Sequence, residues 1–196
     1  MTKQECRTTN ENAFTLLELL VVIAIIAVLA GLLFPVGQSV LERAKKVQAK
    51  NDLTELVIAT NAFYTEYGRY PTAQTIDASA IYGPGHLKND VVLNELRARS
   101  SVLNTRQIVF FSPAEDTNQL SPKGKIGIDG QFYDPWGSAY SIAIDADYDN
   151  QVTNPYTADT GAGPAAIRQG VISWSIGKDK TQGTSFNTSD DVISWQ

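Results

Sequence analysis

The chain has 196 residues and a formal net charge of −5, because 16 Lys and Arg side chains stand against 21 Asp and Glu. This length suits one domain with appendages, 43% hydrophobic residues suit a globular core, and the acidity argues against a nucleic-acid-binding surface. Cys6 and His86 are the single residues of their types, which excludes an internal disulfide, a thiolate zinc site and a multi-histidine metal site.

The acidic residues are concentrated toward the C-terminus. Residues 1–128 hold 13 basic and 12 acidic side chains, whereas residues 129–196 hold 3 basic side chains and 9 acidic ones, all Asp. Asp favours turns and caps, so the C-terminal third is predicted to consist of strands and loops that carry carboxylates. Loops of this kind can bind hard cations.

Residues 14–34 form an apolar run, FTLLELLVVIAIIAVLAGLLF. At about 1.5 Å per residue this run spans about 30 Å, the thickness of a bilayer core, so a membrane-spanning helix is predicted. A cleaved secretory signal is disfavoured, because the run exceeds the usual length of such a signal and ends in Leu33-Phe34-Pro35 without a small-residue cleavage pattern. We therefore expect the segment to be retained.

Glu18 is the one ionisable residue of this run. A carboxylate inside an apolar span costs about 2.5 to 3.5 kcal/mol, so it needs either an explanation or a partner. It could lie near the membrane edge and reach water. Alternatively, a cut after Ala13 would give Phe14 a free amine one helical turn before Glu18, and across subunits this pair could set the axial register.

The run from Ala13 to Glu18, followed by an unbroken apolar helix with Pro35, resembles the signature of type IV prepilin-like proteins, which include pilins and type II secretion pseudopilins. The resemblance implies that a prepilin peptidase cuts between Ala13 and Phe14, that Phe14 is N-methylated, and that Glu18 guides assembly. It also implies a single-pass protein of the bacterial inner membrane with its C-terminal domain in the periplasm.

Two features depart from this family pattern. Ala13 stands where the family usually has Gly. Two basic residues lie before the span and four lie after it. Because basic residues favour the cytoplasmic side, this count alone would place the part of the chain after the span in the cytoplasm. These residues are Lys3, Arg7, Arg43, Lys45, Lys46 and Lys50. The orientation is therefore taken from the family signature and not from the charge count.

The helical pattern continues to about Tyr67, with apolar residues such as Val40, Val47, Leu56 and Phe63 recurring every three or four positions. A helix from residue 14 to 67 would be about 80 Å long, so its first half is expected to bury against membrane or neighbouring copies. The sequence GRYPT at 68–72 ends the helix. The predicted divisions are a leader at 1–13, a transmembrane or filament-core helix at 14–34, an amphipathic helix at 35–68 and a globular domain at 69–196.

Three shorter elements are predicted in the globular domain. They are a helix at 89–99 with Asn89 as N-cap, a strand at 107–111, and a DPWG turn followed by an alternating strand at 140–144. His86 is predicted to be a surface residue, and Trp136 is predicted to anchor a hydrophobic cluster. The YP turn and the DPWG pattern are both shared with major pseudopilins.

Asp145, Asp147 and Asp149 occupy positions 1, 3 and 5 of a possible calcium loop. An EF-hand has Gly at position 6 and Glu at position 12, where this chain has Asn150 and Tyr156. The match is partial, and a solvated acidic turn is the alternative.

The C-terminal stretches 172–180 and 189–195 resemble the calcium-binding end of major pseudopilins. Carboxylates from two strand ends can converge on one cation, without which adjacent aspartates would repel each other. Lys178 and Lys180 could instead pair directly with these carboxylates. The resemblance implies a ligand set of Asp179, Asp190 and Asp191 through their side chains, Ile176 through its carbonyl, and Thr188 as a weaker candidate.

Together these features predict an α+β, type IV pilin-like fold, in which a long N-terminal helix packs on a small antiparallel sheet with a calcium-binding C-terminal loop. The resemblance implies a structural subunit, the major pseudopilin of a type II secretion system, with structural calcium. Its implied partners are further copies of itself, a prepilin peptidase, minor pseudopilins, the inner-membrane assembly platform and the membrane, but not nucleic acid.

Two other functions fit the sequence less well. A type IV pilin of a surface fibre, used for adhesion, motility or DNA uptake, is disfavoured because many such pilins carry a C-terminal disulfide loop and the predicted mature chain has no cysteine. A hydrolase that uses Asp190 and Asp191 is disfavoured because adjacent strand residues point to opposite faces. We therefore expect no enzyme activity and no catalytic residues.

Overall fold

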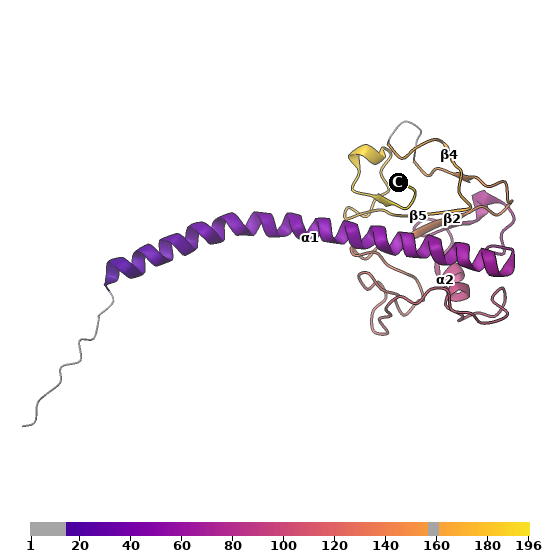
Figure 1. The fold of residues 1–196 in the computed structure, drawn as a ribbon, viewed down its shortest axis with the longest axis horizontal. Coiled ribbons are helices and arrows are strands. Elements are labelled where there is room, and N and C mark those ends of the chain that lie inside the picture. The colour runs from indigo at the N-terminus through magenta and orange to yellow at the C-terminus, as the bar shows by residue number, and fades with distance from the viewer. Residues whose placement is uncertain (1–14, 157–160) are drawn as a thin grey trace, which may run out of the picture. The chain divides into compact units, whose positions relative to one another are not determined.

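The computed structural model describes residues 15–156 and 161–196, apart from the side chains of residues 32–37. The chain comprises two compact units, Met1–Glu42 and Arg43–Gln196. Helix α1 (Leu16–Tyr67) supplies residues to both units (Figure 1). The long N-terminal helix ends at the residue that the sequence predicts.

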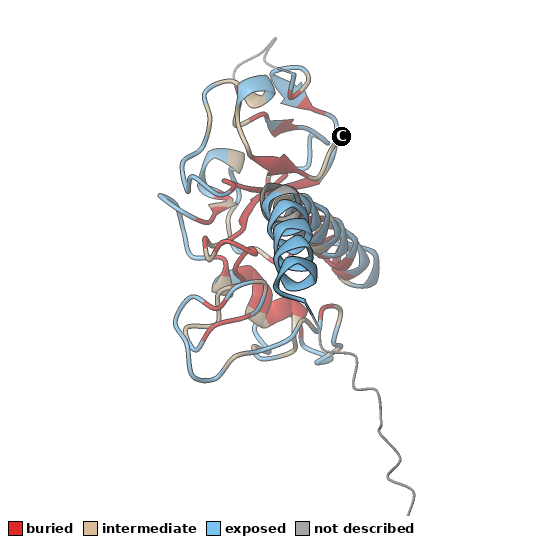
Figure 2. Cartoon of the chain, turned by 90° about the vertical axis from the view of Figure 1, so that its left-hand side faces the viewer, coloured by how far each residue is buried: buried red, intermediate tan, exposed pale blue. Residues whose placement is uncertain are grey.

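In the first unit, every described side chain from Thr15 to Gly31 is exposed (Figure 2). The exposed fraction of the large apolar residues here ranges from 45% at Val22 to 85% at Leu16. An apolar surface of this extent is typical of a segment that contacts lipid or other protein chains. Among the described residues, no helical stretch combines the length and the hydropathy that a membrane crossing requires. The span predicted over 14–34 includes residues outside that description and stays a prediction.

In the second unit, one face of α1 is buried in the core. Its buried residues recur at three- and four-residue intervals, as expected for a helix that packs on a sheet. The helix ends where Gly68 adopts a φ of +68° and its N–H bonds to the Tyr64 carbonyl. The residues that form this buried face are Ala49, Leu53, Leu56, Ala59, Thr60 and Phe63.

The buried face is shorter than the sequence pattern indicates. Val40 and Val47 fit the periodicity, but their side chains are 57% and 61% exposed. The apolar period therefore extends beyond the part of the helix that the sheet covers.

A four-stranded antiparallel sheet has the order β1-β2-β5-β6, and a separate two-stranded sheet pairs β3 with β4. The longest pairing joins β2 to β5, with Ile142 opposite Ser173. The strands are β1 (Ile81–Tyr82), β2 (Ser141–Ile144), β3 (Val152–Thr153), β4 (Ala166–Ile167), β5 (Val171–Ser175) and β6 (Val192–Ile193).

The central strands β2 and β5 are buried along their whole length (Figure 2). In β2, Ile142 and Ile144 belong to the cluster that contains the buried face of α1, whereas Ala143 belongs to a second cluster with the β3–β4 hairpin. The predicted strand is confirmed, and its alternation separates two cores because both faces of the sheet are covered. Trp136 is buried in the first of these cores, as predicted.

Helix α2 (Asp90–Leu96) confirms the predicted helix, although it ends before the predicted residue 99. Asn89 holds the N-cap position, as predicted, but its side chain makes no cap bond because it bonds to backbone groups of Phe132 and Tyr140. Residues 107–111 do not form the predicted strand. The N–H groups of Phe110 and Phe111 instead bond to the carbonyl of Leu96 at the end of α2, which takes this segment out of strand pairing.

Two 3-10 turns complete the described elements, η1 (Asp77–Ser79) and η2 (Phe186–Thr188). Each lies beside a group of carboxylates. His86 is exposed, as predicted.

Candidate metal centres and the N-terminal segment

Asp179, Asp190 and Asp191, here called the C-terminal cluster, meet at adjoining ends of β5 and β6. Pairing of Ser175 with Val192 places the end of β5 next to the start of β6. Gly177 follows β5 with a φ of +68°, a left-handed conformation that turns the chain toward Asp179. Ligand oxygens of the three carboxylates lie within 4.8 Å of one another. The predicted convergence of the three aspartates is therefore confirmed.

Asp190 and Asp191 each accept two hydrogen bonds on one carboxylate oxygen, and Asp179 Oδ1 accepts the Thr181 N–H. Asp190 Oδ2 accepts the N–H groups of Lys178 at 2.7 Å and Asp179 at 3.2 Å. Asp191 Oδ2 accepts the Tyr156 hydroxyl at 2.8 Å and the Gly183 N–H at 2.9 Å. The other oxygens, Asp190 Oδ1 and Asp191 Oδ1, are buried and have no hydrogen-bond partner in the part of the chain that the structure describes.

These orphaned oxygens fit a bound cation. Two oxygens that share one calcium ion at about 2.4 Å each lie at most about 4.8 Å apart, and one oxygen from each of the three carboxylates meets this limit. Burial raises the pKa of Asp191, and the neighbouring charges of Asp190 and Asp179 raise it further. A cation would relieve this repulsion and would satisfy the buried oxygens.

The remaining residues of the predicted ligand set lie close to this cluster in the chain. Ile176 follows β5 directly and is buried. Thr188 lies in η2, where its hydroxyl donates to the Ser185 carbonyl. Their roles as ligands stay predictions. The hydrogen bond from Lys178 to Asp190 comes from its backbone N–H.

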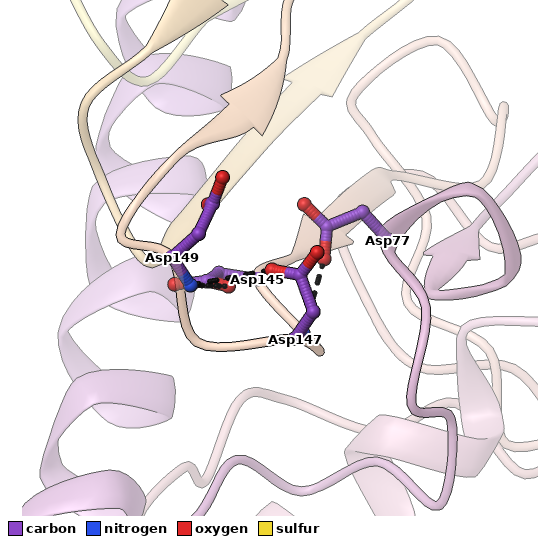
Figure 3. A group of neighbouring side chains, drawn as sticks. All are labelled: Asp77, Asp145, Asp147 and Asp149. Carbon is purple, nitrogen blue, oxygen red and sulfur yellow. Dashed lines mark hydrogen bonds between the residues drawn. The ribbon is translucent and has the colours of Figure 1, made fainter.

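A second group, here called the Asp145 cluster, contains Asp77, Asp145, Asp147 and Asp149 (Figure 3). Asp77 comes from η1, whereas the other three belong to the loop after β2. The sequence pattern identified the loop but missed Asp77. No local signal links that residue to a loop so distant in the chain.

In the Asp145 cluster, backbone N–H groups already occupy carboxylate oxygens. Asp145 accepts the N–H groups of Asp149 and Asn150, and Asp77 Oδ1 accepts the Ala146 N–H at 2.7 Å. Asp147 Oδ1 also accepts the Asp149 N–H. Burial raises the pKa of Asp145, the N–H groups lower it, and the charges of Asp77 and Asp149 raise it. The loop therefore has a closed network of its own.

The backbone conformation of the loop at 145–150 matches a calcium loop at a position where its residue type does not. Asn150, at the position of the EF-hand glycine, has a φ of +62°, which is the left-handed conformation that glycine supplies there. Tyr148 is also left-handed, and its ring stacks on Tyr70 with ring centroids 5.9 Å apart. Tyr70 in turn stacks on Tyr64 of α1 at 4.6 Å. Aromatic packing therefore ties the loop to the end of α1.

At the N-terminus, Thr15 and Glu18 form a reciprocal cap on α1. Glu18 Oε2 accepts the N–H and the hydroxyl of Thr15, both at 2.8 Å, and the Glu18 N–H donates to the Thr15 hydroxyl oxygen at 3.2 Å. The Thr-x-x-Glu spacing is a capping-box signature, a signal that our sequence analysis did not use. The predicted cleavage site, Ala13 and Phe14, lies outside the described residues.

A long N-terminal helix whose later part packs on a small antiparallel sheet defines an α+β fold of the type IV pilin-like class. The model of the prokaryotic N-terminal methylation motif matches residues 8–34. The chain thus carries this methylation motif at its N-terminus and has a fold consistent with type IV pilin-like proteins. The predicted α+β, pilin-like fold is confirmed, its calcium-binding C-terminal loop stays a prediction, and the predicted resemblance has independent support.

Curated relatives include both pilins and secretion proteins. The chain is 36% identical to the type II secretion system core protein G of Escherichia coli (strain K12) over 77 residues. These residues cover 39% of this chain and 53% of the relative. It is 40% identical over 61 residues to the type IV major pilin protein PilA of Myxococcus xanthus (strain DK1622), covering 31% of this chain and 28% of PilA. It is 27% identical over 122 residues to the fimbrial protein EcpC of Eikenella corrodens, covering 62% and 79%.

The aligned segments thus span between 28% and 79% of these relatives, and about half of the secretion protein. No solved structure matches the chain.

Proposed function

We propose that this protein is the major pseudopilin of a type II secretion system, a structural subunit that polymerises into a periplasmic pseudopilus. The observation that carries the proposal is the methylation motif at residues 8–34, which continues into a helix whose described apolar side chains are exposed from Leu16 to Leu29. Such a surface needs lipid before assembly and neighbouring helices after it. The similarity to the secretion system core protein G supports the choice of machine.

Processing and assembly form one sequence of events in this proposal. A prepilin peptidase cuts between Ala13 and Phe14, and the new Phe14 amine is methylated. Glu18 then exchanges its cap contacts with Thr15 for the amine of a neighbouring subunit, which neutralises both charges in the apolar filament core. Before assembly the N-terminal helix anchors the subunit in the inner membrane, with residues 69–196 in the periplasm. Minor pseudopilins and the inner-membrane platform are the further partners.

Calcium is the proposed cofactor, with a structural role at the C-terminal cluster. Asp179, Asp190 and Asp191 would hold it, with the Ile176 carbonyl and Thr188 as further oxygen ligands. The buried and unpartnered oxygens of Asp190 and Asp191 support this site. When bound, the ion supplies positive charge that holds the β5–β6 connection together. The Asp145 cluster is the second candidate site, because four carboxylates approach one another there.

A type IV pilin of a surface fibre is the alternative function, and the similarities to PilA and EcpC favour it. The single cysteine of the chain, Cys6, lies in the predicted leader, so a disulfide loop of the mature chain is excluded. Deletion of the gene separates the two functions. Loss of secreted proteins from the medium with surface fibres unchanged supports the pseudopilin, and the reverse result supports the pilin.

Co-expression of the full chain with a prepilin peptidase tests the processing step. Intact-mass analysis should show loss of residues 1–13 and one added methyl group on Phe14. A mature chain that starts at another residue would refute this step.

Glu18→Ala should leave the folded body intact and lower filament yield, with Glu11→Ala in the leader as the matched control. Unchanged filament yield in Glu18→Ala would refute the assembly role.

A further inference from the structure

The β3–β4 hairpin lies beside the C-terminal cluster but is separate from the main sheet. Within the described strands, β3 and β4 pair with each other and with no third strand. The hairpin is therefore held to the rest of the unit largely by side-chain contacts. Val152 and Ile167 pack in the second core with Trp174 of β5.

Tyr156, just after β3, makes the most direct contact between the hairpin and the C-terminal cluster. Its side chain is buried, and its hydroxyl donates to Asp191 Oδ2 at 2.8 Å. Its ring packs edge-on against Phe186 of η2 at 5.6 Å and lies 6.2 Å from the ring of Trp195. Aromatic packing on both neighbours fixes the direction in which the hydroxyl points.

The contact with Tyr156 determines which Asp191 oxygen remains for a ligand. Tyr156 and the Gly183 N–H both donate to Oδ2, while Oδ1 is buried without a partner in the described part of the chain. Rotation of the carboxylate would therefore break two hydrogen bonds. In metal sites, donors of this kind orient the ligands and affect affinity.

Three further hydrogen bonds join the hairpin segment to the C-terminal region. The Gln182 side-chain amide donates to the Pro155 carbonyl at 2.8 Å, and Trp195 Nε1 donates to the Ala162 carbonyl at 2.7 Å. The Gln196 side-chain amide donates to the Gly161 carbonyl. Of these contacts, the one made by Tyr156 reaches a carboxylate of the C-terminal cluster itself. It is therefore the contact through which a bound ion and the hairpin can influence each other.

We propose that Tyr156 is a positioning residue of the C-terminal cation site and that cation binding there secures the β3–β4 hairpin against the body. This inference rests on the proposed calcium site. Because coupling between two events is reciprocal, hairpin docking and calcium affinity should favour each other by the same factor. Loss of the ion should release the hairpin locally while the main sheet stays folded.

The test uses the full chain in detergent, with calcium ion as the probe, in the wild type, Tyr156→Phe and Tyr133→Phe. Tyr133→Phe is the matched control, because it also removes the hydroxyl of a buried tyrosine that donates to a carboxylate. That carboxylate is Asp129, whose Oδ2 lies 2.7 Å from the Tyr133 hydroxyl and which is distant in sequence from the C-terminal cluster. Isothermal titration measures calcium affinity. Amide hydrogen exchange measures the protection of residues 152–156 and 161–167 with calcium and with chelator.

We expect Tyr156→Phe to weaken calcium affinity by about tenfold, and Tyr133→Phe to stay within about twofold of the wild type. Calcium should protect the hairpin in the wild type and in the control but not in Tyr156→Phe. A purely structural role would lower protection equally with and without calcium. Asp179→Asn provides a variant that leaves Tyr156 and its contacts in place, and its hairpin should remain at the calcium-free level of protection.

Equal calcium affinity and equal calcium-dependent protection in Tyr156→Phe and the wild type would overturn the role of Tyr156 and leave the calcium site standing. Hairpin protection that still rises with calcium in Asp179→Asn would also overturn the proposed coupling. If the wild type itself bound no calcium, both the proposed site and the role of Tyr156 would be overturned.

Discussion

The two acidic clusters are built from the same side chain but differ in what their oxygens do. In the Asp145 cluster, backbone N–H groups from the same loop bond to the carboxylates. In the C-terminal cluster, two buried oxygens have no partner among the described residues. Proximity of carboxylates is thus common to both, whereas unsatisfied hydrogen-bonding capacity belongs to one. The second property distinguishes a loop that can close on itself from a site that needs a ligand.

The largest expected effect is the response to calcium. The detergent-solubilised full chain should gain about 2.7 kcal/mol of stability at a calcium concentration about 100 times the dissociation constant, which raises the unfolding temperature by roughly 5 to 10 °C. Asp179→Ala should abolish this rise, and Asp147→Ala should retain it. Thermal unfolding with calcium and with chelator measures both. If the rise disappeared in Asp147→Ala and persisted in Asp179→Ala, the assignment of the two clusters would be reversed.

The second prediction concerns the Asp145 cluster without calcium. Asp77→Ala should destabilise the chain by about 1 to 2 kcal/mol, because the buried Ala146 N–H loses its acceptor. Asp116→Ala is the control, since its carboxylate accepts the Asn118 N–H in an exposed turn and its removal should change stability by less than about 0.5 kcal/mol. Denaturant unfolding in chelator measures both variants. Equal, small effects would show that the closed network contributes little to stability.

Local patterns in the sequence were sufficient to predict much of this fold. The apolar period of the long helix, stopped by Gly68 and the following Tyr70-Pro71, predicts α1 because each signal acts within one or two turns of helix. The strand after the DPWG turn is similarly local. The C-terminal cluster was predicted from the resemblance to major pseudopilins, and its members meet because they flank β5 and β6, which pair with each other.

The errors and omissions arose where distant segments decide the outcome. Asn89 has the residue type of a helix cap, but backbone groups near Phe132 and Tyr140 compete for its side chain. The apolar run at 107–111 has strand propensity, but the end of α2 takes its N–H groups. Asp77 joins a loop remote from it in sequence. Such choices depend on tertiary contacts that no local pattern contains.

The third prediction uses Asp52, a carboxylate outside both clusters that accepts the Tyr140 hydroxyl at 2.7 Å. Burial raises the pKa of Asp52 from 3.8 to about 6 in the folded chain. Because the folded-state value is the higher one, the stabilising contribution of Asp52 is present below pH 3.8 and is lost as the pH rises through about 6. Partial exposure reduces this loss to on the order of 1 kcal/mol.

Asp52→Asn should therefore flatten the dependence of stability on pH between 4 and 7 and should be more stable than the wild type at pH 7. Denaturant unfolding across that range measures the effect, with Asp116→Asn in an exposed turn as the control. Parallel curves for the wild type and Asp52→Asn would contradict the assigned shift. Asp52 thus serves as a reference carboxylate that accepts one hydroxyl and lies outside both acidic clusters, although the charges of Glu55 and Asp134 also raise its pKa.

The last and smallest effect returns to the C-terminal cluster. Without calcium, Asp190→Asn should stabilise the chain by about 0.5 to 1 kcal/mol, because it removes an unpaired charge next to Asp191 and keeps an oxygen for the Lys178 and Asp179 N–H groups. With calcium the order should reverse, since the variant has lost a ligand. Asp77→Ala is expected to destabilise under both conditions. An Asp190→Asn chain that is less stable in chelator would mean that its carboxylate is already satisfied, and the distinction between the two clusters would then fail.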